Sequence, residues 1–202
     1  MKNAFKLILT SFLVGTIILS CDKKEEAEKT DYVKIGTNEF KLVDGSLENY
    51  GPDTDTADGW EYDGYNLDLI LVSDGLTIGN SGGELSISGK GNVLYFELIV
   101  SAADQLVPGE YVFNDNYSDL PTGCFDYSEY YLNVDSSVEG SSNEIKITSG
   151  KVIVEKSGDT YIIKIDCKDE KGNTVSGNYK GTLNYFNYDD DTKSARTKFG
   201  HR

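Results

Sequence analysis

The chain has 202 residues, which suits one domain or two small ones, and its formal net charge at pH 7 is −15. Such an acidic surface repels nucleic acid phosphates and anionic lipid headgroups, so we expect no nucleic acid partner. The 14 tyrosines and 21 glycines favour β-structure with many turns over a helical protein.

Residues 1–20 have the pattern of a secretory signal. Lys2 and Lys6 supply a positive start, and the apolar run from Leu7 to Leu19 is short for a bilayer span. An uncleaved membrane helix is the alternative. Because those two lysines are the only charged residues of the segment, its removal would leave a chain with a net charge of −17.

The segment ends in "IILSC", which resembles a bacterial lipobox, with Leu19 a less usual residue at its position. The resemblance implies cleavage before Cys21 and acyl chains on Cys21, which would anchor the protein to a membrane. Residues 21–31 contain almost no apolar side chain and are expected to form a flexible tether. Their lysines and glutamates look like the export signal of Bacteroidota surface lipoproteins. We therefore expect a lipid-anchored protein at the outer membrane or cell surface of a Gram-negative bacterium, on either side of that membrane.

Short strand patterns separated by glycine-containing turns fill the chain from residue 32 to 188. The expected strands are 32–36, 39–43, 65–72, 92–102 and 111–114, followed by the runs 144–150, 151–159, 160–173 and 174–186. The last four runs predict an antiparallel meander. This pattern predicts one all-β domain, an antiparallel β-sandwich, with a lipocalin-like β-barrel as the alternative. Residues 189–202 are expected to be a polar, disordered tail.

The alternation of apolar residues also predicts which side chains are buried. In the strand at 65–72, Tyr65 shares a face with three leucines, and in the run from 160 the residues Ile163 and Ile165 share a face with Cys167. The strand at 92–102 is apolar on both faces, which is typical of a central strand.

Two segments carry a resemblance to a protein class. "GNVLYFELIV" with "LVPGEYVF", and "SGDTYIIKIDCKDEKGNTVSGNYKGTLNYF", resemble small β-rich lipoproteins of Bacteroidota, many of them without an assigned function. The shared motifs are turn glycines and alternating aromatic residues. The resemblance implies a fold and a location, and it brings no catalytic residue with it.

With Cys21 acylated, Cys124 and Cys167 are left as the one intrachain pair that could form a disulfide in an oxidising compartment. Burial of Cys167 as a free thiol is the alternative.

The segment 51–65 holds the candidate metal and modification sites. Asp53, Asp55 and Asp58 precede a glycine in a spacing near that of a Ca²⁺ loop, and solvated turn carboxylates are the alternative. The tripeptide Asp55-Thr56-Ala57 looks like the acceptor for O-glycosylation in Bacteroidota, which makes Thr56 the candidate residue.

Aromatic residues next to these carboxylates suggest a sugar site. Trp60, Tyr62 and Tyr65 could pack their rings on sugar CH groups while carboxylates accept hydroxyl hydrogens. Ordinary packing within the sheet is the alternative for the two tyrosines.

Catalysis has little support, because the single histidine is His201 at the C-terminal end. We expect no enzyme and no cofactor apart from the candidate Ca²⁺. The sequence favours a non-catalytic binding module for a glycan or an envelope protein. The alternatives are a lipocalin-like carrier of a small apolar ligand and an envelope hydrolase with paired carboxylates.

Overall fold

The computed structural model describes residues 29–52, 62–138, 140 and 143–188, and these residues form strands and turns without a helix. The strands are β1 (Tyr32–Ile35), β2 (Asn38–Pro52), β3 (Tyr65–Ser73), β4 (Leu76–Ser81), β5 (Glu84–Val100), β6 (Gly109–Phe113), β7 (Cys124–Asp135), β8 (Asn143–Ser157), β9 (Thr160–Asp169), β10 (Thr174–Gly181) and β11 (Asn184–Asn187). The expectation of an all-β protein is confirmed.

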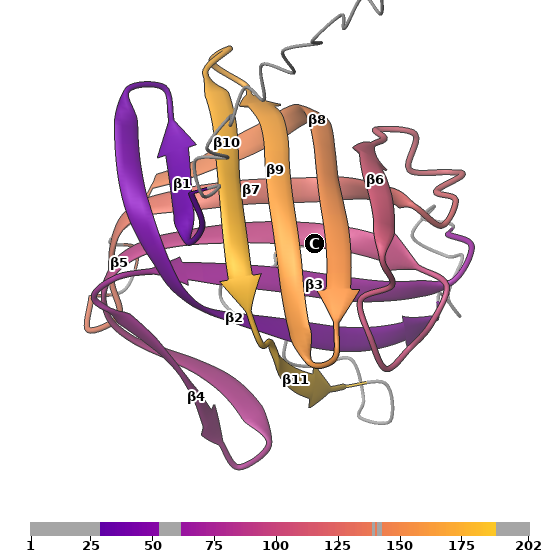
Figure 1. Cartoon of the computed structure of the whole chain (residues 1–202), viewed down its shortest axis with the longest axis horizontal. Coiled ribbons are helices and arrows are strands. Elements are labelled where there is room, and N and C mark those ends of the chain that lie inside the picture. Colours follow the sequence, from indigo (N-terminus) through magenta and orange to yellow (C-terminus); the bar gives the residue numbers. More distant parts are fainter. Residues whose placement is uncertain (1–28, 53–61, 139, 141–142, 189–202) are drawn as a thin grey trace, which may run out of the picture.

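The strands close into a barrel (Figure 1). Strands β1, β2, β3, β5, β7, β8, β9 and β10 pair antiparallel in chain order, and β1 also pairs with β10, so Val33 lies between Phe40 and Gly177. Strand β6 inserts between β7 and β8, which makes nine strands in the ring; β4 and β11 lie outside it. The predicted sandwich is therefore wrong, and the lipocalin-like barrel fits better. The four-residue strand β1 closes the barrel, because it pairs on both of its edges. Nothing in its sequence indicates that it has two neighbouring strands.

Apolar side chains fill the inside of the barrel. The predicted inward faces are confirmed: Leu69 of β3 and Ile163 of β9 belong to one buried cluster with Phe96 of β5. These three side chains have 0% exposure, so no void large enough for a water molecule borders them. Tight packing of this kind stabilises the barrel. It leaves no space for a ligand beside those three residues.

One predicted turn is wrong. The runs 144–150 and 151–159 form the single strand β8, and within "TSGK" only Thr148 lies in a bulge of the pairing with β9. Gly150 has φ +115°, and a Cβ there would lie 2.3 Å from the carbonyl oxygen of Asp166. Glycine is required by this close approach of two backbones, so it does not end a strand here.

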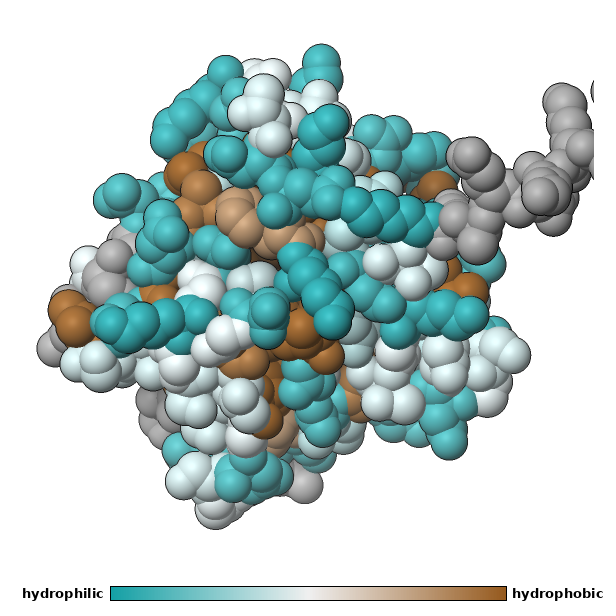
Figure 2. All heavy atoms as spheres, turned by 60° about the vertical axis from the view of Figure 1, so that its left-hand side comes forward, coloured by the Kyte–Doolittle hydropathy of each residue, from teal (hydrophilic) through white to brown (hydrophobic). Residues whose placement is uncertain are grey.

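The outer side of β3, β5 and β7 is buried too, as predicted for the apolar strand at 92–102. Ile70, Val93 and Tyr95 point outward from the barrel and pack against a second layer. That layer comes from Leu76 and Leu85 of the β4–β5 hairpin, with Phe186 of β11. Over the face shown in Figure 2, hydrophilic residues dominate and apolar ones form narrow strips between them. The covered outer side is the unusual feature of this barrel, because the outer side of a soluble barrel can simply face water.

Candidate functional site

Four carboxylates cross the outer side of the barrel on four neighbouring strands. Glu48 of β2 lies opposite Asp68 of β3, and Asp68 lies opposite Glu97 of β5. Asp126 of β7 lies in the bulge between the pairs Phe96–Ser128 and Leu98–Phe125, next to Glu97. We call these four residues the carboxylate row. Each of them is at most 1% exposed.

Strand alternation explains how the row is placed. Each row residue on β2, β3 and β5 directly follows or precedes a residue of the inner core, such as Leu47 or Leu67, and therefore points outward. Burial of a carboxylate disfavours its charged form, and like charges directly opposite one another destabilise a sheet. Acidic side chains are seldom fully buried, which makes the row a candidate for function.

Polar groups beside the row have bonding capacity to spare. Asn66 donates through Nδ2 to Glu97 Oε1, while its own Oδ1 has no hydrogen-bond partner among the residues that the structure describes. The same holds, within those residues, for the Oγ of Ser46, two residues before Glu48. Both residues are fully buried on the same side of the sheet. Asn66 Oδ1 and Ser46 Oγ could each form a hydrogen bond with one polar group of a ligand.

Glu129 is a further buried acidic residue on β7, three residues after Asp126. Its Oε1 accepts a hydrogen bond from the hydroxyl of Tyr131. Burial raises the pKa of Glu129 to about 8; the Tyr131 bond opposes this rise and the nearby carboxyl of Glu144 adds to it. Lys146 lies directly opposite Glu129 on β8 and lowers the pKa. Glu129 is therefore largely protonated at neutral pH.

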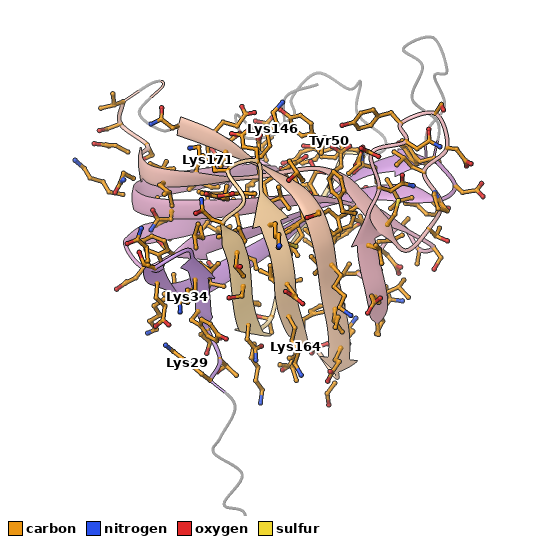
Figure 3. All side chains as sticks on the ribbon, turned by 90° about the horizontal axis from the view of Figure 1, so that it is seen from above. Lys29, Lys34, Tyr50, Lys146, Lys164 and Lys171 are labelled. Carbon is orange, nitrogen blue, oxygen red and sulfur yellow. The ribbon has the colours of Figure 1, made fainter. Side chains whose placement is uncertain are left out.

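Partly exposed tyrosines border the row at both ends. Tyr50 of β2 stacks on Tyr188 with ring centroids 5.3 Å apart. At the β7 end, the Nζ of Lys146 lies 5.6 Å from the ring centroid of Tyr127. Figure 3 shows Tyr50 and Lys146 on one side of the barrel, opposite Lys34 and Lys164. The row thus lies between two aromatic borders on the side away from those lysines.

Most of the site residues predicted from sequence lie outside the described residues: Cys21, Asp53, Asp55, Thr56, Asp58 and Trp60. Tyr62 packs against Ile99 and Leu120 on the outer side, whereas Tyr65 packs against the inner core. The structure therefore does not bring these two tyrosines together. Within the ranges that the structure describes, no three acidic, cysteine or histidine side chains are grouped to hold a metal ion.

The predicted Cys124–Cys167 disulfide is not formed, and both residues are buried free thiols. Cys124 packs outside the barrel with Ile99 and Leu120, whereas Cys167 lies in the inner core. Burial raises the pKa of each thiol to about 12. The sheet itself separates the two sulfurs, and spacing along the chain could not reveal that.

The row itself was not predicted, although its residues leave a trace in the sequence. "YNLDLILV" and "VLYFELIV" are strands in which a single acidic residue interrupts apolar neighbours. A single outward carboxylate is ordinarily solvated, so neither strand by itself suggests a site. Only the pairing register between the strands shows that the carboxylates lie side by side.

Within the described ranges, the structure has no helix of a length and hydropathy that would cross a membrane. No known protein family, no curated protein and no solved structure matches the chain.

Proposed function

We propose that this protein is a cell-envelope lipoprotein, anchored through Cys21, whose barrel is a non-catalytic module that binds an uncharged glycan over the carboxylate row. The partly exposed Tyr50, Tyr127 and Tyr188 are the contacts within immediate reach, and the buried row is reached only when the side chains over it move aside. The observation that carries the proposal is the row itself: Glu48, Asp68 and Glu97 are fully buried and lie in lateral register. Acidic side chains are among the residues least often buried in a protein. Retention of a costly polar arrangement is typical of a binding or catalytic site.

The chemistry of the row fits a ligand rich in hydroxyl groups. Carboxyl oxygens accept hydrogen bonds, and sugar hydroxyls can donate to them. Neighbouring strands are ~4.8 Å apart, so the row from β2 to β7 is roughly 14 Å long. The rings of Tyr50, Tyr127 and Tyr188 are half-buried and offer faces for sugar CH groups at its ends. The net charge of −15 repels uronic and sulfated sugars, which favours an uncharged oligosaccharide.

Calorimetry with neutral oligosaccharides tests the glycan site, on detergent-solubilised protein that carries its anchor. Asp68→Asn and Glu97→Gln should each weaken binding about fivefold, because each replaces an accepting oxygen by a donor and a hydrogen bond contributes ~0.5–1.5 kcal/mol. Glu155→Gln is the matched control, since Glu155 is exposed on β8. Absence of saturable binding across a neutral glycan array, or equal binding by Asp68→Asn and wild type, would refute the site.

The anchor needs a separate test, because it can fail while the glycan site holds. Cells fed an alkyne analogue of palmitate should label the wild type and not Cys21→Ser. A labelled Cys21→Ser protein would place the acyl chain on another residue.

A second candidate function is hydrolysis of a glycosidic bond. Asp68 and Glu97 are directly opposite on adjacent strands, where Cβ atoms are ~4.5–5.5 Å apart, and a retaining glycosidase uses two carboxyl groups at about that separation. Release of product from aryl glycosides by the wild type, and its loss in Asp68→Asn, would favour the enzyme. Binding without turnover favours the module. The carrier has the least support, because the inner core residues named above have no space beside them.

A further inference from the structure

Strand β4 has one edge without a partner in the fold. β4 pairs with β5 and with no other described strand. The hairpin that these strands form, residues 76–89, extends beyond the barrel, and the outer edge of β4 faces away from it (Figure 1). An edge strand presents a row of main-chain groups to which another strand can bond.

The opposite edge of the same hairpin is capped. The amide of Leu85 donates to the hydroxyl of Tyr188 at 2.8 Å, and the amide of Gly89 donates to Ser136 Oγ at 2.9 Å. These bonds show that Leu85 and Gly89 direct their main-chain groups away from β4. Their partners in the pairing, Asn80 and Leu76, must then direct theirs away from β5.

The β4 edge therefore offers the main-chain groups of Leu76, Ile78 and Asn80. No hydrogen bond between described residues caps these groups. The side chains of Leu76 and Ile78 pack inward on the outer layer, so the free groups belong to a well-held strand. The edge is consequently preorganised for strand addition.

This edge also lacks the usual protection against pairing. Exposed edges are normally guarded by charged residues, proline or a bulge. Residues 75–83, "GLTIGNSGG", contain none of the charged residues that make up 26% of the chain, and they contain no proline. The β4–β5 register is regular from Leu76 to Ser81, without a bulge.

We infer that β4 is a dimerisation strand, which pairs antiparallel with β4 of a second copy of this chain about a two-fold axis at Ile78. Copies with a net charge of −15 repel one another, and the uncharged β4 edge lets two copies meet without opposed charges. Antiparallel pairing of one segment with itself is two-fold symmetric by construction. Ile78 then exchanges hydrogen bonds with Ile78 of the second copy, and Leu76 pairs with Asn80.

Sedimentation of the detergent-solubilised, anchored protein over a range of concentrations tests the dimer. The wild type should shift from monomer to dimer as concentration rises, and added salt should favour the dimer by screening repulsion. Thr77→Lys should weaken dimerisation at least tenfold, because it places two ammonium groups on one face of the joined strands. Ser88→Lys is the matched control: Ser88 is exposed and pairs with Thr77, but it lies on the strand away from the edge.

Amide hydrogen exchange gives a second readout that does not depend on a variant. Dimerisation should slow exchange at Ile78 and Asn80 as concentration rises, while Thr77 and Gly79, which bond within the hairpin, stay unchanged. If the protein stayed monomeric at every concentration, the proposal would be overturned, and the β4 edge would be available only to a strand of another protein. Equal effects of Thr77→Lys and Ser88→Lys, or a dimer without new protection at Ile78, would overturn it as well.

Discussion

Asp68 lies directly opposite Glu97 in the pairing of β3 with β5, and both side chains are fully buried. Two carboxylates in this position repel one another when both are charged, and burial strengthens the repulsion. The pair is therefore a place where a change of one carboxyl group should be felt by the other. This relationship leads to the first prediction.

Asp68→Asn should stabilise the protein by up to ~1 kcal/mol at pH 7 while it weakens glycan binding, since it replaces one of two carboxyl groups that lie opposite one another and keeps the side-chain shape. Urea unfolding measures the change. Asp166→Asn is the control, because Asp166 is exposed on β9 and its loss should change the free energy of unfolding little. A large destabilisation by Asp68→Asn would mean that Asp68 holds the fold together.

Stability should fall as pH rises from about 4.5 to 8, through the titration of Glu129. Its pKa is about 8 in the folded protein against an ordinary 4.5, so in this range the folded state keeps a proton that the unfolded state loses. Deprotonation in the fold is unfavourable because the side chain is buried. Glu129→Gln should flatten this slope when melting temperatures are compared at pH 5, 6.5 and 8. If melting temperature depended on pH as steeply in Glu129→Gln as in the wild type, the pH dependence would belong to other groups. Glu155→Gln is the control and should leave the pH dependence unaltered.

Gly150→Ala should destabilise the protein by about 3 kcal/mol or more, because it combines a strained φ with a clash against the β9 backbone. Gly158→Ala is the matched control: Gly158 also has a positive φ, but its Cβ would meet no atom within 4 Å. That control should lose only about 1 kcal/mol. Similar losses in the two variants, measured by urea unfolding, would show that close packing of β8 on β9 matters little.

Cys124 and Cys167 should both react with a thiol reagent in guanidinium without any reductant, and neither should react quickly in the native protein at pH 8. The native thiols are slow because burial keeps them protonated, with pKa values of about 12. Mass spectrometry counts the labels. If Cys124 and Cys167 stayed unlabelled in the denatured, unreduced protein, the predicted disulfide would be present after all.

The sequence predicted those parts of the fold that depend on local alternation. Ile163 and Ile165 face the core as expected, because their pattern of burial is set within one strand. Closure of the barrel was not predictable, since it depends on pairing between β1 and β10 at opposite ends of the described chain. The segment "TSGK" was mistaken for a turn because glycine marks both turns and places where two strands approach closely.

The candidate site was harder to predict for a related reason. Glu48 and Asp68 occupy alternating positions that would ordinarily face water, and the sequence around them gives no sign that both are fully buried. The lateral register that aligns them is a property of strand pairing, which no single strand encodes. Tyr62 and Tyr65 show the converse, because they are neighbours in sequence and face opposite sides of the sheet.

The closing strand also sets an order of events for a chain that is made from its N-terminus. Tyr32 on β1 pairs with Asn178 on β10, so the ring cannot close until almost the whole domain has been synthesised. Until then the edges of β1 and of the last completed strand are open, and such long-range pairings form slowly. For the exported lipoprotein proposed above, this delay would keep the chain unfolded long enough to pass through a narrow secretion channel.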